Sequence, residues 1–135
     1  MKECTVNAVI DSIETVTAFV DEILEENDCP IKVQMQIDIV IDELFSNIAN
    51  YAYGEASGTA TVCAGYDGEK GEFVLIFIDS GVPYDPIKAE EPDITLSAED
   101  RKIGGLGIFL VKKTMDDIRY RYEDGKNILT VTKKF

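Results

Sequence analysis

The sequence predicts a single domain over residues 1–135, in which helices and strands are mixed in one α/β (α+β) fold. Two long segments carry apolar residues at helical spacing, and five shorter segments have the composition or the alternation of strands. No repeat, linker or low-complexity stretch divides the chain, and its length suits one hydrophobic core. These observations favour one compact unit that contains both kinds of secondary structure.

The first half of the chain predicts a strand over residues 3–9 and helices over 12–26 and 32–53. Asp11 or Ser12 is the expected N-cap of the first helix, and Cys29-Pro30 ends it. In the second helix, polar side chains occupy the arc beside the apolar one: Gln36, Glu43, Ser46, Asn47 and Asn50. The apolar arc is the expected core face and comprises Val33, Ile37, Val40, Ile41, Leu44, Ile48 and Tyr51.

The second half predicts strands over 57–66 and 72–78, a helix over 104–115, and strands over 118–123 and 127–134. Asp124-Gly125 indicates a hairpin between the last two strands. Residues 73–78 are apolar at every position, so this strand is either covered on both faces or lines a pocket with its outer face. Residues 79–102 form a long proline-containing segment, which we expect to act as a lid.

Composition excludes several classes of function. The formal net charge of −13 disfavours nucleic acid and anionic membranes as partners, because both need a basic protein surface. The longest strongly apolar run is too short to cross a bilayer and the N-terminus lacks an apolar leader, so we expect a cytoplasmic protein. Three widely spaced cysteines and no histidine predict reduced thiols rather than a disulfide framework or a zinc site.

Three groups of residues carry potential chemistry. Glu43 and Asn47 lie one helical turn apart, which suits a general base beside a Mg²⁺ ligand. Asp79 ends an apolar strand, where its carboxylate could accept a hydrogen bond from an exocyclic amine, and Gly81 leaves room for a flat ring. Gly104 and Gly105 open a helix whose free N–H groups could hold phosphate. Each group alone is more often structural: a solvated face, a strand-ending turn or a tight loop.

Together and in this order, the three groups resemble the motifs of the GHKL (Bergerat-fold) superfamily of ATP-binding domains. Residues 42–53 match its N-box, residues 79–86 its first glycine box, and residues 104–111 its second. The finer resemblance is to bacterial anti-sigma-factor serine/threonine kinases, through Pro-Tyr-Asp-Pro at 83–86 and the tail at 119–127. This branch often has histidine where Tyr51 stands. The last strand lacks the Gly-Thr pair that helps to hold adenine elsewhere, and Asn127 is the nearest polar substitute.

The resemblance implies a two-layer sandwich, with a mixed, mainly antiparallel sheet and helices on one face. It implies ATP between the layers, with Mg²⁺ at Asn47, Glu43 as the catalytic base and Arg101 as a catalytic group that stabilises the transferred phosphoryl group. The implied nucleotide-binding residues are Asn47, Asn50, Asp79, Gly81, Pro83, Gly104, Gly105, Leu106, Gly107 and Asn127.

The implied activity is phosphorylation of a serine or threonine of an anti-sigma-factor antagonist, a STAS-type protein, by a domain that also sequesters a sigma factor. A homodimer is compatible with this interpretation. Two alternatives stay open. In one, the domain binds ATP as a conformational ligand and controls a partner without transferring phosphate; in the other, it is an ATP-hydrolysing fragment of the gyrase or chaperone type.

Overall fold

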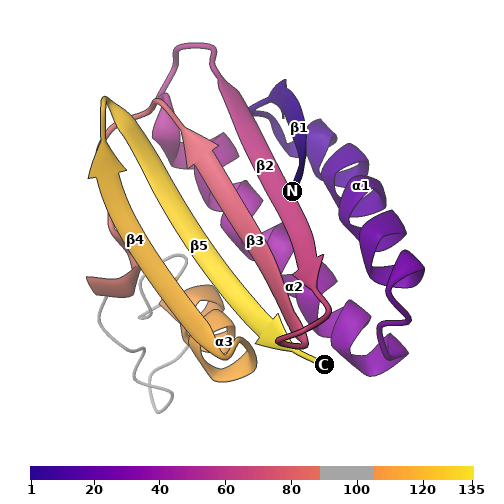
Figure 1. The fold of residues 1–135 in the computed structure, drawn as a ribbon. Helices are drawn as coiled ribbons and strands as arrows, with labels where there is room; N and C mark the ends of the chain where they lie inside the picture. Colours follow the sequence, from indigo (N-terminus) through magenta and orange to yellow (C-terminus); the bar gives the residue numbers. More distant parts are fainter. Residues whose placement is uncertain (89–104) are drawn as a thin grey trace.

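A computed structural model describes residues 1–88 and 105–135 of the chain (Figure 1). Its longer elements follow one another in the order β1 (Lys2–Asn7), α1 (Ile13–Glu26), α2 (Ile31–Asn47), β2 (Thr59–Asp67), β3 (Glu72–Asp79), α3 (Gly105–Thr114), β4 (Asp117–Glu123) and β5 (Lys126–Lys134). A π-helical turn, Ile48–Ala52, continues α2, and short 3₁₀ turns lie at Ile10–Ser12 and Pro86–Lys88. The predicted elements are therefore present, with their ends shifted by a few residues.

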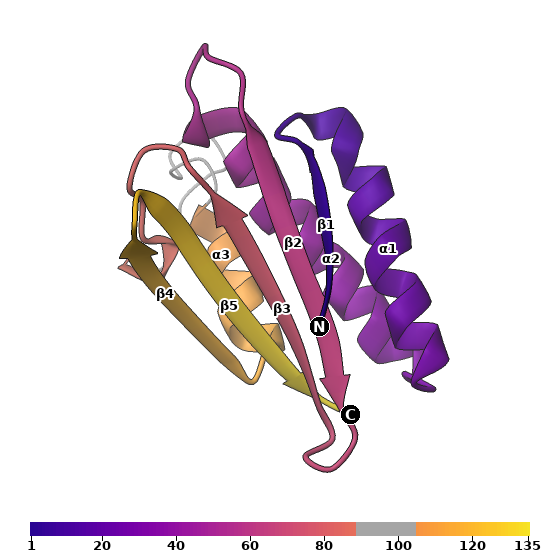
Figure 2. The same ribbon diagram turned by 45° about the horizontal axis from the view of Figure 1, so that its top comes forward.

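The strands form one five-stranded sheet in the order β1-β2-β3-β5-β4. Every pairing in it is antiparallel, so the expectation of a mixed sheet is corrected for the strands that the structure describes. The three helices lie on one side of the sheet, as the two views show (Figures 1 and 2). This arrangement is the two-layer sandwich with helices on one face that the resemblance implied.

The core lies between the helices and the inner face of the sheet. It contains fully buried side chains from α1, α2 and the central strands, among them Val16, Val20, Leu24, Ile37, Ile41, Phe45, Val62, Phe73, Leu75 and Phe77. The predicted core arc of α2 is confirmed for Ile37, Val40, Ile41 and Leu44. It is wrong at Tyr51, which is 53% exposed, because the helix widens into the π turn before this residue and the 100° periodicity no longer applies.

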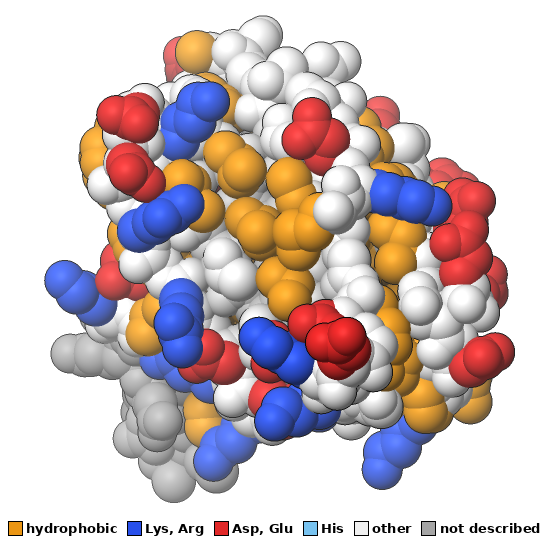
Figure 3. Space-filling view, viewed as in Figure 1, with side chains coloured by type: hydrophobic (Ala, Val, Ile, Leu, Met, Phe, Trp, Pro, Cys, Tyr) orange, Lys and Arg blue, Asp and Glu red, His pale blue; other side chains and the backbone are white. Residues whose placement is uncertain are grey.

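Strand β3 has two unlike faces, although all its residues from 73 to 78 are apolar. Phe73, Leu75 and Phe77 are buried beneath the helices, whereas Val74, Ile76 and Ile78 on the other face are only half-buried. Apolar side chains gather over the middle of this open face (Figure 3). We expected the outer face either to be covered or to line a pocket. Among the described residues it does neither and is partly open to solvent.

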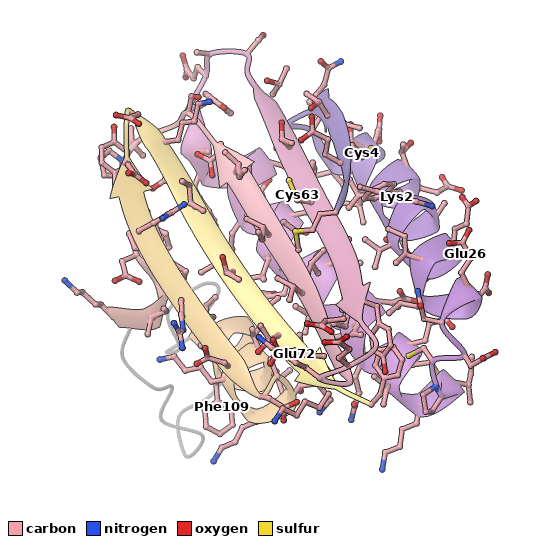
Figure 4. The ribbon with its side chains drawn as sticks, in the orientation of Figure 1. Lys2, Cys4, Glu26, Cys63, Glu72 and Phe109 are labelled. Atoms are coloured by element: carbon pink, nitrogen blue, oxygen red, sulfur yellow. The ribbon has the colours of Figure 1, made fainter. Side chains whose placement is uncertain are left out.

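The first strand is tied to the end of the first helix. Lys2 Nζ lies 3.5 Å from Glu26 Oε2 in an exposed ion pair, and the free thiols of Cys4 and Cys63 sit on the neighbouring strands β1 and β2 (Figure 4). Helix α1 begins directly after a 3₁₀ turn with Ser12 at the predicted N-cap position, although Ser12 makes no side-chain capping hydrogen bond. None of the helices in the described part of the chain has the length and apolar character that a membrane crossing would require.

Candidate functional site

A cavity of about 170 Å³ opens between the end of α2 and the inner face of the sheet. The π turn closes one side of it, strands β3, β5 and β4 form its floor, and residues 82–86 border its mouth. Most of the wall is apolar or aromatic, with a few polar groups among it. The lining residues are Leu44, Asn47, Ile48, Tyr51, Ala52, Phe77, Asp79, Val82, Pro83, Tyr84, Pro86, Tyr120, Asn127 and Leu129.

Asp79 is the buried carboxylate of this cavity, with 7% of its surface exposed. Its Oδ1 accepts hydrogen bonds from the backbone N–H of Gly81 and from Nδ2 of Asn127, both at 2.9 Å. Among the described residues, no donor reaches its Oδ2. The carboxylate is therefore oriented through one oxygen, and the other can accept a hydrogen bond from a ligand in the cavity.

Asn127 stands directly opposite Asp79 in the β3–β5 register and is the hub of a buried network. Besides Asp79, its Nδ2 donates to the carbonyl of Val82 at 2.9 Å, and its Oδ1 accepts from the N–H of Tyr84 and from the hydroxyl of Tyr120. The amide thus holds the segment after β3 in place and orients Asp79. Its contact with adenine, implied by the resemblance, stays a prediction.

Gly81 packs against the π turn. A Cβ at this position would lie 2.2 Å from the backbone oxygen of Ala52, and the neighbouring Val82 N–H donates to that oxygen at 2.8 Å. The space on the Cβ side of Gly81 is therefore filled by the backbone of Ala52, and a contact between Gly81 and a flat ring stays a prediction. Tyr53 reinforces this junction, because its hydroxyl donates to the Thr59 carbonyl at 2.6 Å and accepts from the Ser80 N–H at 2.8 Å.

Glu43 meets helix α3 at Gly107, beside the cavity. A Cβ on Gly107 would fall 1.8 Å from Cδ of Glu43, so the carboxylate lies directly against this residue. Burial and the neighbouring Asp42 raise the pKa of Glu43, while a hydrogen bond with the side chain of Asn47 lowers it. A carboxylate whose pKa is above its ordinary value is better matched to proton transfer near neutral pH.

The structure brings some of the expected site residues together and not others. Asn47, Asp79, Pro83 and Asn127 line the cavity, and Glu43 and Gly107 lie in contact beside it. Asn50 is exposed and does not line the cavity. Gly105 and Leu106 are the first two residues of α3. Arg101 and Gly104 lie outside the described residues.

Several aromatic and apolar lining residues were not identified from the sequence motifs. Tyr84 lies within the first glycine box, and Tyr120 is on β4 opposite Leu129, facing the helices. Burial raises the pKa of Tyr120, and this keeps its phenol protonated as a donor to Asn127. The alternation within β4 could have revealed Tyr120, because Ile118 and Tyr120 alternate with the charged Arg119 and Arg121.

The structure is that of a two-layer α/β ligand-binding domain. Helices cover one face of an antiparallel sheet, and a cavity with a buried carboxylate lies between the two layers. The chain belongs to the histidine kinase-like ATPase domain family, whose model matches residues 6–133. The family name implies the use of ATP.

Two relatives of known name are similar to this chain over most of its length. The chain is 29% identical over 101 residues to the serine/threonine-protein kinase BtrW of Bordetella bronchiseptica, across 75% of this chain and 70% of that protein. It is 32% identical over 95 residues to the serine-protein kinase RsbW of Bacillus cereus, across 67% of this chain and 58% of RsbW. It therefore spans less than two thirds of RsbW.

A solved structure with a similar fold supports the architecture. A chain in the crystal structure of the SiaB–SiaC complex from Pseudomonas aeruginosa superposes with a TM-score of 0.57 at 17% identity. The superposition covers 98% of the present chain and 89% of that chain. At this identity the likeness concerns the fold alone.

Proposed function

We propose that this domain binds ATP with Mg²⁺ and transfers the γ-phosphate to a serine or threonine hydroxyl of a protein partner. The observation that carries the proposal is the position of the Glu43 carboxylate, one turn from Asn47, against α3 and beside a cavity that contains a buried aspartate. The similarity to BtrW and RsbW, both named as kinases, supports the same reaction.

The adenine ring is proposed to enter the cavity between Leu44, Phe77 and Leu129, with its amine donating to Oδ2 of Asp79. Apolar walls favour a flat ring, and a single oriented carboxylate selects an amino group over a carbonyl. The phosphates then extend toward the start of α3, where the N–H groups of a helix N-terminus favour negative charge.

Asn47 is proposed as the Mg²⁺ ligand. Its side chain hydrogen-bonds to the Glu43 carboxylate, which can only accept, so the amide N–H is used and the amide oxygen remains for a hard cation. When bound, Mg²⁺ neutralises negative charge on the phosphates. We expect Asn47→Ala to keep its fold and to lose the dependence of nucleotide affinity on Mg²⁺, as measured by calorimetry with and without the metal.

Glu43 is the proposed general base. In the reaction, the substrate hydroxyl oxygen forms a bond to the γ-phosphorus, the bond to the bridging oxygen breaks, and ADP leaves with that electron pair. The hydroxyl proton passes to the Glu43 carboxylate. Arg101 is proposed to stabilise the charge on the transferred group, together with the glycine-rich residues 104–107.

The proposed substrate is a STAS-type anti-sigma-factor antagonist, and the second proposed partner is a sigma factor that the domain sequesters. Both follow from the resemblance to anti-sigma-factor kinases and from the relation to RsbW and BtrW. The same domain could then alternate between the two partners according to the phosphorylation state of the antagonist.

The central test is Glu43→Gln. The variant keeps the shape of the side chain and removes the base, so nucleotide binding should stay near the parent value while phosphotransfer falls by about 10²-fold or more. Transfer of γ-phosphate from labelled ATP to a purified antagonist measures the rate. A parent protein that binds the sigma factor in a nucleotide-dependent way and never transfers phosphate would instead be an ATP-binding regulatory module.

The cavity is tested separately by Asp79→Asn. The substitution replaces one acceptor oxygen by a donor, so the variant should lose about 1–3 kcal/mol of ATP binding free energy. Calorimetry gives the affinity, and Asn7→Ala is a control because Asn7 is an exposed residue of β1 outside the cavity. Unchanged ATP affinity in Asp79→Asn would move the adenine out of this cavity.

A further inference from the structure

Helix α2 exposes a row of large apolar side chains on the side opposite the core. Ile31 is 69% exposed, and Met35 and Ile39 are each 60% exposed. They are spaced by four residues, so they are neighbours along one face of the helix. Single exposed apolar residues are common on soluble proteins, but an ordered row of three on a helix whose other face is buried indicates a contact surface.

The row leads to the proposed catalytic carboxylate. The next position at the same spacing is Glu43, about 18 Å along the helix from Ile31 at 1.5 Å per residue. Each step of four residues turns by about 40°, so the row passes slowly around α2 toward the side where Glu43 contacts Gly107. A partner that covers the row therefore approaches the carboxylate that would take its hydroxyl proton.

The surroundings of the row are acidic. Helices α1 and α2 together carry eight acidic residues, and Lys32 is the sole basic residue in them. The exposed Asp42 lies three residues after Ile39 and borders the row, whereas Asp38 is turned toward Asp21 on α1. Charge complementarity then favours a partner with apolar side chains flanked by lysine or arginine.

We propose that the exposed face of α2, formed by Ile31, Met35, Ile39 and Asp42, is the docking surface for the protein substrate. This inference rests on the proposed phosphotransfer. The substrate presents apolar side chains to the row and a basic residue to Asp42, and its phosphoacceptor serine or threonine lies at the Glu43 end. The register with Glu43 assigns the surface to the substrate rather than to the sequestered sigma factor.

The test uses the full chain and a purified STAS-type antagonist from the same genome. Met35→Glu and the double variant Ile31→Gln/Ile39→Gln alter exposed side chains outside the cavity, so ATP affinity should stay at the parent value. The Kd for the antagonist and its KM in phosphotransfer should each rise at least tenfold, with kcat within twofold of the parent. Val9→Gln is the control, because Val9 is an exposed apolar residue, at 49%, away from α2.

The charge contribution has its own variant. Asp42→Lys should weaken antagonist binding, and this loss should shrink as salt is raised, because screening removes the repulsion. Asp42→Asn should give a smaller loss of the same kind. Equal antagonist affinity in Asp42→Lys and the parent at low salt would overturn the assignment of a basic partner.

Binding and transfer together separate the two proposals. If the row variants lose antagonist binding while the parent binds it and transfers no phosphate, the docking surface stands and the phosphotransfer fails. If the row variants bind and phosphorylate the antagonist like the parent, the docking surface is overturned and the kinase stands. Loss of sigma-factor binding with intact antagonist binding, or a parent that binds no antagonist, also overturns the proposal.

Discussion

The two ends of the helical layer hold buried carboxylate oxygens in opposite situations. At the cavity, Oδ1 of Asp79 has two donors, one from the backbone and one from Asn127. Between α1 and α2, Oδ1 of Asp21 and Oδ1 of Asp38 are buried without a hydrogen-bond partner within the described structure. The contrast shows that burial alone does not decide the state of a carboxylate; the available donors do.

Asp38 meets this need for a donor by holding a proton, because a protonated carboxyl group can donate to a neighbouring carboxylate. Burial, the hydrogen bond with Asp21, and the charges of Asp21 and Glu25 raise the pKa of Asp38 to about 7. Burial, followed by the charges of Asp38 and Asp21, also raises the pKa of the nearby Cys29 thiol. The charged groups around Asp38 that raise its pKa, Asp21 and Glu25, are both acidic. Asp79, in contrast, accepts hydrogen bonds from neutral donors in fixed positions.

The largest expected effect on stability is at the cavity, where the buried groups around Asn127 are hydrogen-bonded. Asn127→Leu removes the donor to Asp79 and Val82 and the acceptor for Tyr84 and Tyr120, leaving several buried polar groups without partners. We expect a loss of about 3 kcal/mol in the free energy of unfolding. Urea denaturation measures it, with Asn50→Ala as an exposed control. A loss under about 1 kcal/mol would mean that water replaces the network.

Glu43 offers a second, smaller test, because its carboxylate hydrogen-bonds to Asn47 and lies against Gly107. Gly107→Ala should cost about 2 kcal/mol of stability through overpacking. In a Glu43→Ala background the same substitution should cost almost nothing, since the clashing carboxylate is absent. Thermal unfolding of the four proteins measures the coupling. Equal costs in both backgrounds would show that Gly107 does not make room for Glu43.

The smallest effect on stability depends on pH and concerns the Asp21–Asp38 pair. The folded chain keeps a proton on Asp38 between its ordinary pKa of 3.8 and about 7, whereas the unfolded chain releases it. The unfolded state then binds fewer protons, so stability falls as pH rises through this window, by roughly 1–2 kcal/mol after allowance for partial exposure. Denaturation from pH 4 to 8 measures the slope.

Asp38→Asn tests whether Asp38 causes this pH dependence. The variant gives Asp21 a fixed N–H donor, as Asp79 already has. The variant should lose most of the pH dependence between pH 4 and 7 and should be more stable than the parent at pH 8, by about 1 kcal/mol. Glu14→Gln on α1 is the control for removal of one exposed acid. A variant with the parent's slope would remove Asp38 from the titration.

Local sequence patterns are sufficient to predict the parts of the fold that depend on neighbouring residues. The apolar spacing in α1 and α2, the alternating strands and the Asp124-Gly125 turn place the elements within a few residues, because each is decided by neighbours along the chain. The order of the three motifs was likewise sufficient to indicate the family that residues 6–133 match.

The tertiary structure alone decided which side chains meet. The antiparallel strand order places Asn127 opposite Asp79, and the π turn after α2 carries Tyr51 to the surface and Ala52 onto Gly81. The packing of α1 on α2 brings Asp21 to Asp38 from two helices whose separate patterns give no sign of the pair. These contacts join residues far apart in sequence, and their geometry depends on strand register and helix packing, which no local periodicity specifies.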